Sequence, residues 1–114
     1  MNSVAEEKSF QFAVRIVKLY RYLARTKREL VLSKQLLRAG TSIGANIAEA
    51  EQAQSHADFV AKISIALKEA AETNYWIRLL HSTGYLSQIE YESIINDCRE
   101  VERILTAILN SSKK

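Results

Sequence analysis

The chain has 114 residues, enough for one modest hydrophobic core, so we expect a single domain over residues 1–114. Hydrophobic residues make up 47% and charged residues 25%, which excludes a disordered chain, and the single cysteine excludes an internal disulfide and a multi-cysteine metal site. The net charge of +3 is unevenly distributed: residues 1–40 hold nine Lys and Arg against three acidic residues, whereas residues 41–114 hold seven against ten.

Little in the sequence interrupts a helical pattern, because it contains no proline and only three glycines. The sequence has no run of about 18 uncharged apolar residues, so no membrane span is predicted. Its polar beginning, M-N-S-V-A-E-E-K, does not resemble a signal peptide. We therefore expect an all-α protein of the cytoplasm with no membrane partner.

A first helix is predicted over residues 4–26, with two adjacent apolar stripes at helical spacing. One stripe contains Phe10, Ala13, Val17, Tyr20 and Ala24, and the other contains Phe12, Ile16, Leu19 and Leu23. One small core cannot cover so broad an apolar surface, so the second stripe predicts an interface between subunits.

The second predicted helix, residues 31–54, contains the unusual stretch G-T-S-I-G-A-N-I-A-E-A. It lacks the G-K-[ST] ending of a phosphate-binding loop, and no strand precedes it as a dinucleotide fingerprint requires. Gly40 and Gly44 each cost about 1 kcal/mol in a helix interior. We interpret them as small residues that let a neighbouring helix approach closely.

Two further helices are predicted over residues 56–82 and 88–110. Each begins after a capping signal, Ser55 with Asp58 and Ser87 with Glu90, and Gly84 is a helix stop after the third. Short connections between four long amphipathic helices favour an antiparallel up-down-up-down four-helix bundle.

No catalytic, cofactor-binding or metal-binding residues are predicted, and no cofactor. Neither histidine belongs to the E-x-x-H pairs of bundle di-iron sites, and no serine or cysteine has a nucleophile's partners at a recognisable spacing. Polar residues do share one face of the second helix: Arg38, Ser42, Asn46 and Glu49. Arg38 and Glu49 need partners elsewhere; Asn46 and Glu49 either fix helix register or line a ligand pocket.

The basic residues around the first interhelical connection are candidates for binding nucleic acid: Arg21, Arg25, Lys27, Arg28, Lys34 and Arg38. The alternative is a solvated basic helix end that complements the helix dipole. Tyr75, Trp76 and Arg78 suit packing within the subunit or oligomer, stacking on nucleic-acid bases, or a protein interface.

The residues L-L-R-A-G-T-S-I-G-A-N-I-A-E-A and Q-S-H-A-D-F-V-A-K-I-S-I-A-L-K-E-A-A-E-T-N-Y-W-I-R-L-L resemble the bacterial four helix bundle protein family. That family includes proteins encoded in intervening sequences of 23S ribosomal RNA genes, and the accessory variability protein of diversity-generating retroelements is similar. The resemblance runs from about Leu36 to Tyr85. The ribosomal members often have S-[IV]-P-A-N-I-A-E-G, whereas Gly44 replaces the proline here and Ala50 the final glycine.

The resemblance implies an antiparallel bundle that assembles as a homopentamer. The retroelement accessory protein binds nucleic acid and its reverse transcriptase through a basic surface. In that motif Ser42, Gly44, Asn46 and Glu49 are interpreted as structural. Our leading hypothesis is a non-enzymatic oligomeric bundle that binds RNA, DNA or a nucleoprotein partner through its basic surface. The alternatives are a protein-interaction scaffold without nucleic acid, and an enzyme or ligand carrier using Asn46 and Glu49.

Overall fold

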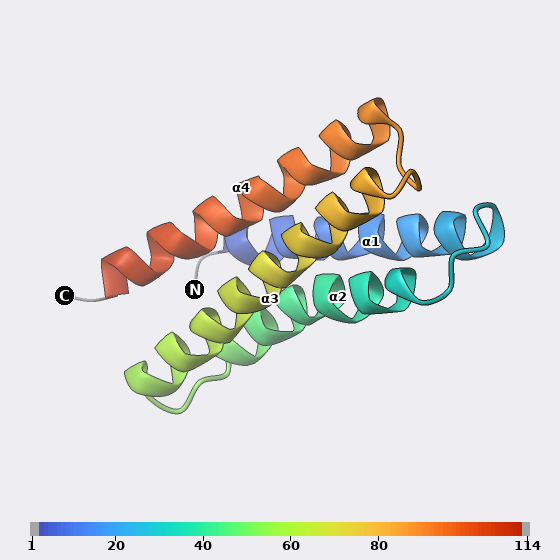
Figure 1. Ribbon diagram of the computed structural model, residues 1–114. Coiled ribbons are helices and arrows are strands. Elements are labelled where there is room, and N and C mark those ends of the chain that lie inside the picture. Colours follow the sequence, from blue (N-terminus) through green and yellow to red (C-terminus); the bar gives the residue numbers. More distant parts are fainter. Residues whose placement is uncertain (1–2, 113–114) are drawn as a thin grey trace.

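Four long helices form nearly all of the protein in a computed structural model that describes residues 3–112 (Figure 1). The bounds are Ser3–Arg25 for α1, Leu32–Ala50 for α2, His56–Ser82 for α3 and Gln88–Ser112 for α4. No strand occurs within this range. The predicted all-α four-helix fold is confirmed.

The helices form an elongated bundle in which each runs opposite to the one before it (Figure 1). The extents are 45 × 20 × 19 Å, which fits helices of 19 to 27 residues that rise about 1.5 Å per residue. Among the described residues α1 packs against α2 and α4, and α3 packs against the same two helices. α1 and α3 therefore occupy diagonally opposite corners.

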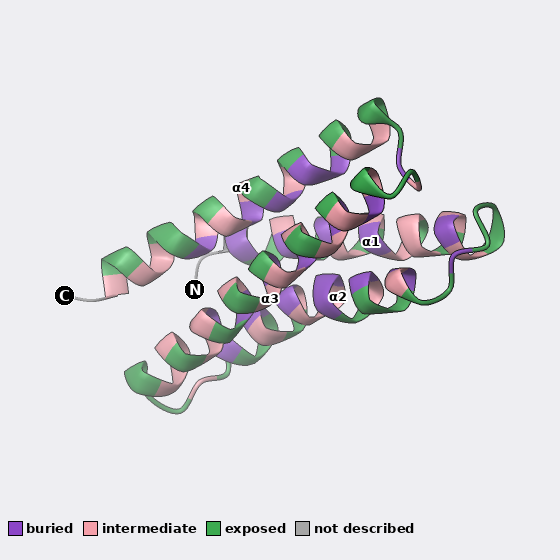
Figure 2. Ribbon diagram, viewed as in Figure 1, coloured by how far each residue is buried: buried purple, intermediate pink, exposed green. Residues whose placement is uncertain are grey.

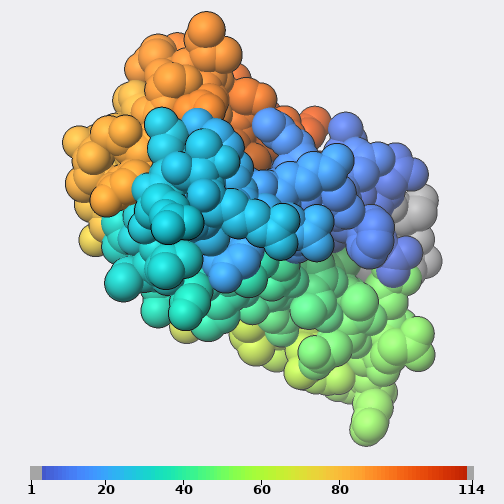
Figure 3. All heavy atoms as spheres, turned by 90° about the vertical axis from the view of Figure 1, so that its right-hand side faces the viewer, coloured from blue at the N-terminus to red at the C-terminus, as the bar shows by residue number. Residues whose placement is uncertain are grey.

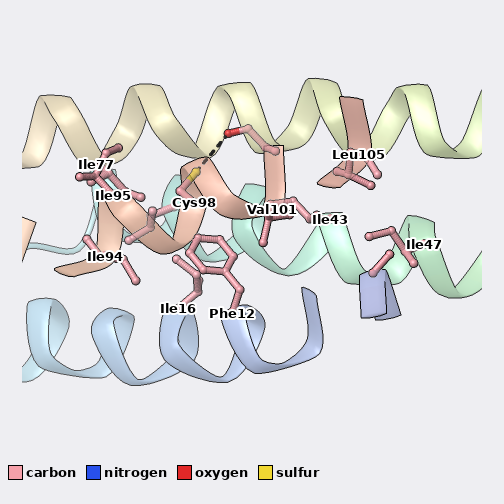
Figure 4. Close-up of a cluster of buried hydrophobic side chains, with 14 of the residues drawn as sticks. Phe12, Ile16, Ile43, Ile47, Ile77, Ile94, Ile95, Cys98, Val101 and Leu105 are labelled. Carbon is pink, nitrogen blue, oxygen red and sulfur yellow. Dashed lines mark hydrogen bonds between the residues drawn. The ribbon is translucent and has the colours of Figure 1, made fainter. Parts of the chain in front are cut away.

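The core lies along the bundle axis, where the buried faces of the helices meet (Figure 2). Figure 4 shows side chains from all four helices converging, among them Phe12, Ile43, Ile77 and Leu105. Each is at most 2% exposed. The apolar stripe of α1 that contains Phe12 and Ile16 supplies this core. Phe10, from the other stripe, remains 68% exposed.

Gly40 of α2 leaves room for a buried side chain of α1. A Cβ atom there would lie 2.8 Å from two carbons of the fully buried Ile16 side chain. Gly44 is looser, because its Cβ would meet the nearest atoms of Ser9 only at 3.5 Å, an ordinary contact. The interpretation that a glycine admits the neighbouring helix is confirmed at Gly40.

Both predicted capping signals are present. The Asp58 amide donates to Ser55 Oγ at 3.0 Å, the Glu90 amide donates to Ser87 Oγ at 3.1 Å, and Glu90 returns the interaction by accepting from the Ser87 amide. Gly84 has φ +89°, as a glycine stop requires. Helices α3 and α4 therefore begin where the sequence predicts.

The prediction was wrong at the end of α2, which stops at Ala50 and not at Gln54. Amides 52 and 53 bond three residues back, so the helix tightens into a turn. Ser55 must adopt extended backbone to cap α3, with φ −155° and ψ 165°, and this ends any continuation from α2. The other helix ends agree with the prediction within two residues.

Ion pairs join the helices along two seams. Between α1 and α4, Arg15 pairs with Asp97 at 2.6 Å and Lys8 with Glu100 at 3.8 Å. Between α2 and α3, Glu49 pairs with Lys62 at 3.0 Å. These side chains are partly or largely exposed, so each pair contributes at most about 1 kcal/mol, but together they favour one register of the bundle.

Candidate nucleic-acid interface

The connection between α1 and α2 has a defined backbone conformation. The Lys27 amide donates to the Tyr22 carbonyl at 3.2 Å and the Glu29 amide to the Leu23 carbonyl at 2.9 Å, which closes the end of α1. Arg28, between them, has φ +59°, in the left-handed region that usually holds glycine or asparagine. The chain therefore keeps an arginine at a strained position in an exposed turn.

Glu29 fixes the start of α2. Its carboxylate accepts hydrogen bonds from the amides of Val31, Leu32 and Ser33 at 2.7–3.1 Å, while the Ser33 hydroxyl donates to the Glu29 carbonyl. Burial by itself would raise the pKa of this carboxyl, which is 8% exposed, but the three amide bonds outweigh burial and hold the pKa below its ordinary value.

This cap was not predicted from the sequence. The available signal was a glutamate four residues before a serine at a helix start, but it lies outside the usual spacing of a capping box.

Five of the six basic candidates surround this connection. Arg21 and Arg25 lie on the last turns of α1, Lys27 and Arg28 in the connection, and Lys34 on the first turn of α2. All five are exposed, and within residues 3–112 no ion pair joins any of them to a carboxylate. We call these five residues the basic end; Figure 3 views the molecule from this side, with the cyan connection facing the reader.

Arg38 stands apart from the basic end. Its guanidinium pairs with Glu69 at 3.4 Å and with Glu72, both on α3. Glu72 also accepts a hydrogen bond from Trp76 Nε1 at 2.9 Å. Arg38 thus has the partner that the sequence indicated it needs, and its charge is already compensated.

A shallow groove of about 500 Å³ lies beside the basic end, between α1 and α4. Lys18, Tyr22 and, from the start of α4, Glu90 line it, and Lys27 Nζ lies 5.9 Å from the centre of the Tyr22 ring. The Ser87 amide, the Tyr22 side chain and the Lys27 charge hold the pKa of Glu90 below its ordinary value, so the groove also contains one carboxylate. Cations next to an aromatic ring are a common surface for nucleic acid. Lys18 was not among the predicted site residues, although its spacing of three and seven residues from Arg21 and Arg25 places it on their face.

The motif residues of α2 have partners within the bundle. Ser42 Oγ donates to the Arg38 carbonyl at 2.7 Å, and Asn46 Nδ2 donates to the Ser42 carbonyl at 2.8 Å, so both bond within their own helix. Glu49 reaches α3 through Lys62. Asn46 therefore does not bridge to a neighbouring helix, whereas Glu49 does.

The nucleophilic and metal-ligating side chains are dispersed. Cys98 is fully buried, its thiol donates to the Ala70 carbonyl at 3.5 Å, and burial followed by the nearby Glu102 carboxylate raises the thiol pKa far above its ordinary value. His81 stacks on Tyr91 with ring centres 4.1 Å apart. Over residues 3–112 no three His, Cys, Asp or Glu side chains gather as metal ligands would.

These features define a class: antiparallel four-helix-bundle proteins with a basic end. No helix among the described residues is long and apolar enough to cross a membrane. The model of the 23S rRNA-intervening sequence protein family matches residues 2–107, so the chain belongs to that family.

Among solved structures, the chain is similar to a protein of unknown function from the S23 ribosomal protein family of Bacteroides thetaiotaomicron VPI-5482. The two share 56% sequence identity and superpose with a TM-score of 0.94, over 95% of this chain and 96% of the other. No curated protein matches the chain significantly. The membership and the bundle predicted from the sequence resemblance are thus confirmed.

Proposed function

We propose that this protein is a non-enzymatic, homo-oligomeric bundle of the cytoplasm that binds RNA, DNA or a nucleoprotein partner through its basic end. The observation that carries the proposal is the set of five exposed basic side chains at one end of the rod, none of which forms an ion pair with a carboxylate of residues 3–112. Unpaired cations gathered on one surface attract a phosphate backbone because binding releases its condensed counterions.

Arg38 does not contribute a phosphate contact in this proposal, since Glu69 and Glu72 already compensate its charge. Lys18 takes its place beside Tyr22. The family name adds support, because it associates the relatives of this chain with intervening sequences of 23S rRNA.

The test is a binding titration against a structured RNA hairpin and a DNA duplex over a range of salt concentrations. Six phosphate contacts, from the basic end and Lys18, predict a slope of about −5.4 for log affinity against log salt on duplex DNA. Arg21→Gln with Arg25→Gln removes two exposed cations one turn apart and should reduce this slope by about 1.8.

The matched control is Arg99→Gln with Arg103→Gln, a second exposed pair four residues apart, but on α4. This variant has the same net charge and should bind almost as the wild type does. The proposal would be overturned if both double variants weakened nucleic-acid binding equally, or if the wild type did not bind at low salt.

Arg28 gives an independent test. An arginine in the left-handed region costs about 1 kcal/mol relative to glycine, and such strain at a surface turn is often retained for function. Arg28→Gly should therefore raise stability in urea while weakening binding. A variant that is more stable and binds equally well would remove Arg28 from the interface.

One observation favours a second function, a protein-interaction scaffold without nucleic acid. Leu30 and Val31 are 53% and 72% exposed in the middle of the basic end. Exposed apolar side chains at a turn are typical of protein contacts. Recovery of one stoichiometric protein that resists nuclease treatment, and is lost with Leu30→Ser and Val31→Ser, would support this alternative.

A further inference from the structure

The surface between α1 and α2 is hollowed by small side chains. Gly44, Ala45 and Ala48 of α2 and Ala13 of α1 line a groove of about 760 Å³, and Phe10 stands at its edge. Ala45 and Ala48 are exposed, as is Phe10 at 68%. We call this surface the α1–α2 groove.

The charged side chains that line the α1–α2 groove are acidic. Glu6 and Glu7 of α1 lie along it, and no Lys or Arg is among its lining residues. The groove therefore combines an apolar floor with a negative border. A partner that fits it needs protruding apolar side chains accompanied by basic ones.

The outer face of α3 has these properties. Ile65 and Tyr75 are 41% and 48% exposed, and Ala61 and Ala71 are exposed near them at helical spacing. Lys68 is exposed on the same face, and Arg78 lies 5.9 Å from the centre of the Tyr75 ring. We call this face the α3 ridge; within residues 3–112 neither cation forms an ion pair.

The groove and the ridge cannot meet within one molecule, because α1 and α3 occupy opposite corners of the bundle. A second copy of the chain brings them together. Contact between two grooves would place Glu6 and Glu7 of one molecule against the same acidic residues of the other. Contact between two ridges would do the same with the basic residues Lys68 and Arg78. The pairing of unlike surfaces avoids both repulsions.

We propose that the α3 ridge of one copy occupies the α1–α2 groove of the next, so that copies associate head to tail. A linear assembly of this kind has one unoccupied groove at one end and one unoccupied ridge at the other. A closed ring forms when the rotation between successive copies brings these two ends together. The inference deepens the homo-oligomeric part of the proposed function and does not depend on nucleic-acid binding.

Two variants test this geometry, each adding a repulsive charge at an exposed position. Ala45→Arg places a cation in the groove opposite the basic ridge, and Ile65→Glu places an anion on the ridge opposite the acidic groove. Each alone should reduce the mass in sedimentation and light scattering from that of the oligomer to 12.9 kDa, the mass of one chain. Matched controls on α4, Ala107→Arg and Ile89→Glu, should keep the wild-type mass.

The mixing experiment distinguishes head-to-tail from symmetric contacts. The Ala45→Arg chain retains an intact ridge and the Ile65→Glu chain an intact groove, so an equimolar mixture should form a mixed dimer. The altered groove and the altered ridge carry opposite added charges, so larger mixed species are expected as well. A symmetric interface between like surfaces would give no such mixed dimer. Restored assembly in a chain carrying both Glu7→Lys and Lys68→Glu, when either alone weakens it, would add support for the charge pairing.

Three results would overturn the inference: full assembly of Ala45→Arg or Ile65→Glu, no dimer on mixing, or equal loss with the α4 controls. These results leave an oligomeric wild type in place, so they refute the surfaces and not the proposed oligomer. A wild type of 12.9 kDa would refute both. The nucleic-acid-binding proposal is tested separately, with the variant that carries Arg21→Gln and Arg25→Gln, and its outcome does not depend on the contact between copies.

Discussion

The two glycines that face α1 should respond in opposite ways to alanine. Alanine gains about 1 kcal/mol over glycine in a helix interior. At Gly44 the added Cβ meets Ser9 at an ordinary 3.5 Å, so Gly44→Ala should stabilise the fold by up to this amount. At Gly40 the Cβ would stand 2.8 Å from two Ile16 carbons that cannot easily move, because that β-branched side chain is fully buried.

Overpacking of this kind costs about 1–3 kcal/mol. The propensity gain is common to both variants, so their difference isolates the clash. Gly40→Ala should unfold at a lower urea concentration than Gly44→Ala, by roughly 0.5–1.5 M for a slope of about 2 kcal/mol/M. Both belong in the Ile65→Glu background, where the proposed contact between copies cannot affect stability.

A third variant tests the steric contact directly. Ile16→Ala removes all three carbons that the new Cβ would meet, so in that background Gly40→Ala should become stabilising. This reversal of sign is the signature of a direct steric contact. If Gly40→Ala is as stable as Gly44→Ala, or if its effect is unchanged without the Ile16 side chain, close helix approach is not the role of Gly40.

Three further outcomes are expected. Glu29→Ala should lower the free energy of unfolding by about 1–2 kcal/mol at neutral pH, because its cap is lost. The folded-state pKa of Glu29 lies below the ordinary value of 4.5, so this difference in stability from the wild type should be present above that pH and disappear as acid protonates the carboxylate. A difference that does not shrink in urea titrations between pH 6 and 3 would contradict the assignment. The Cys98 thiol should react with a chromogenic disulfide reagent only after unfolding, since it is buried and its pKa is raised; rapid reaction of the folded protein would show that the core opens there. Ser87→Ala should lower the free energy of unfolding by about 1 kcal/mol, with Ser111→Ala, an exposed serine near the other end of the same helix, as a comparison in which no cap is lost.

Helix number and most helix ends could be predicted because the signals are local. The Ser55 and Ser87 caps depend on residues three positions away, and the apolar spacing of each helix repeats within a few turns. The end of α2 could not be read in this way. It depends on the extended conformation that Ser55 takes to cap the next helix.

The candidate interface was predicted in part. Five basic residues reach one end of the bundle because they are close in sequence to a single connection, so their grouping follows from the helix order. Arg38 fits the same sequence pattern but has partners on α3, 31 and 34 residues away. The spacing of Lys18 places it on the face of Arg21 and Arg25, but the groove that it lines with Tyr22 depends on α4, which no local pattern indicates.

The sequence by itself determined the four helices, their order and the placement of the basic residues around the first connection, because hydrophobic period, caps and charge are properties of neighbouring residues. Tertiary structure decided which apolar stripe of α1 is buried, that Gly40 and not Gly44 is in tight contact, and that an acidic groove and a basic ridge lie at opposite corners. These depend on the distances and orientations between packed helices, which arise only when side chains far apart in the chain compete for the same core volume.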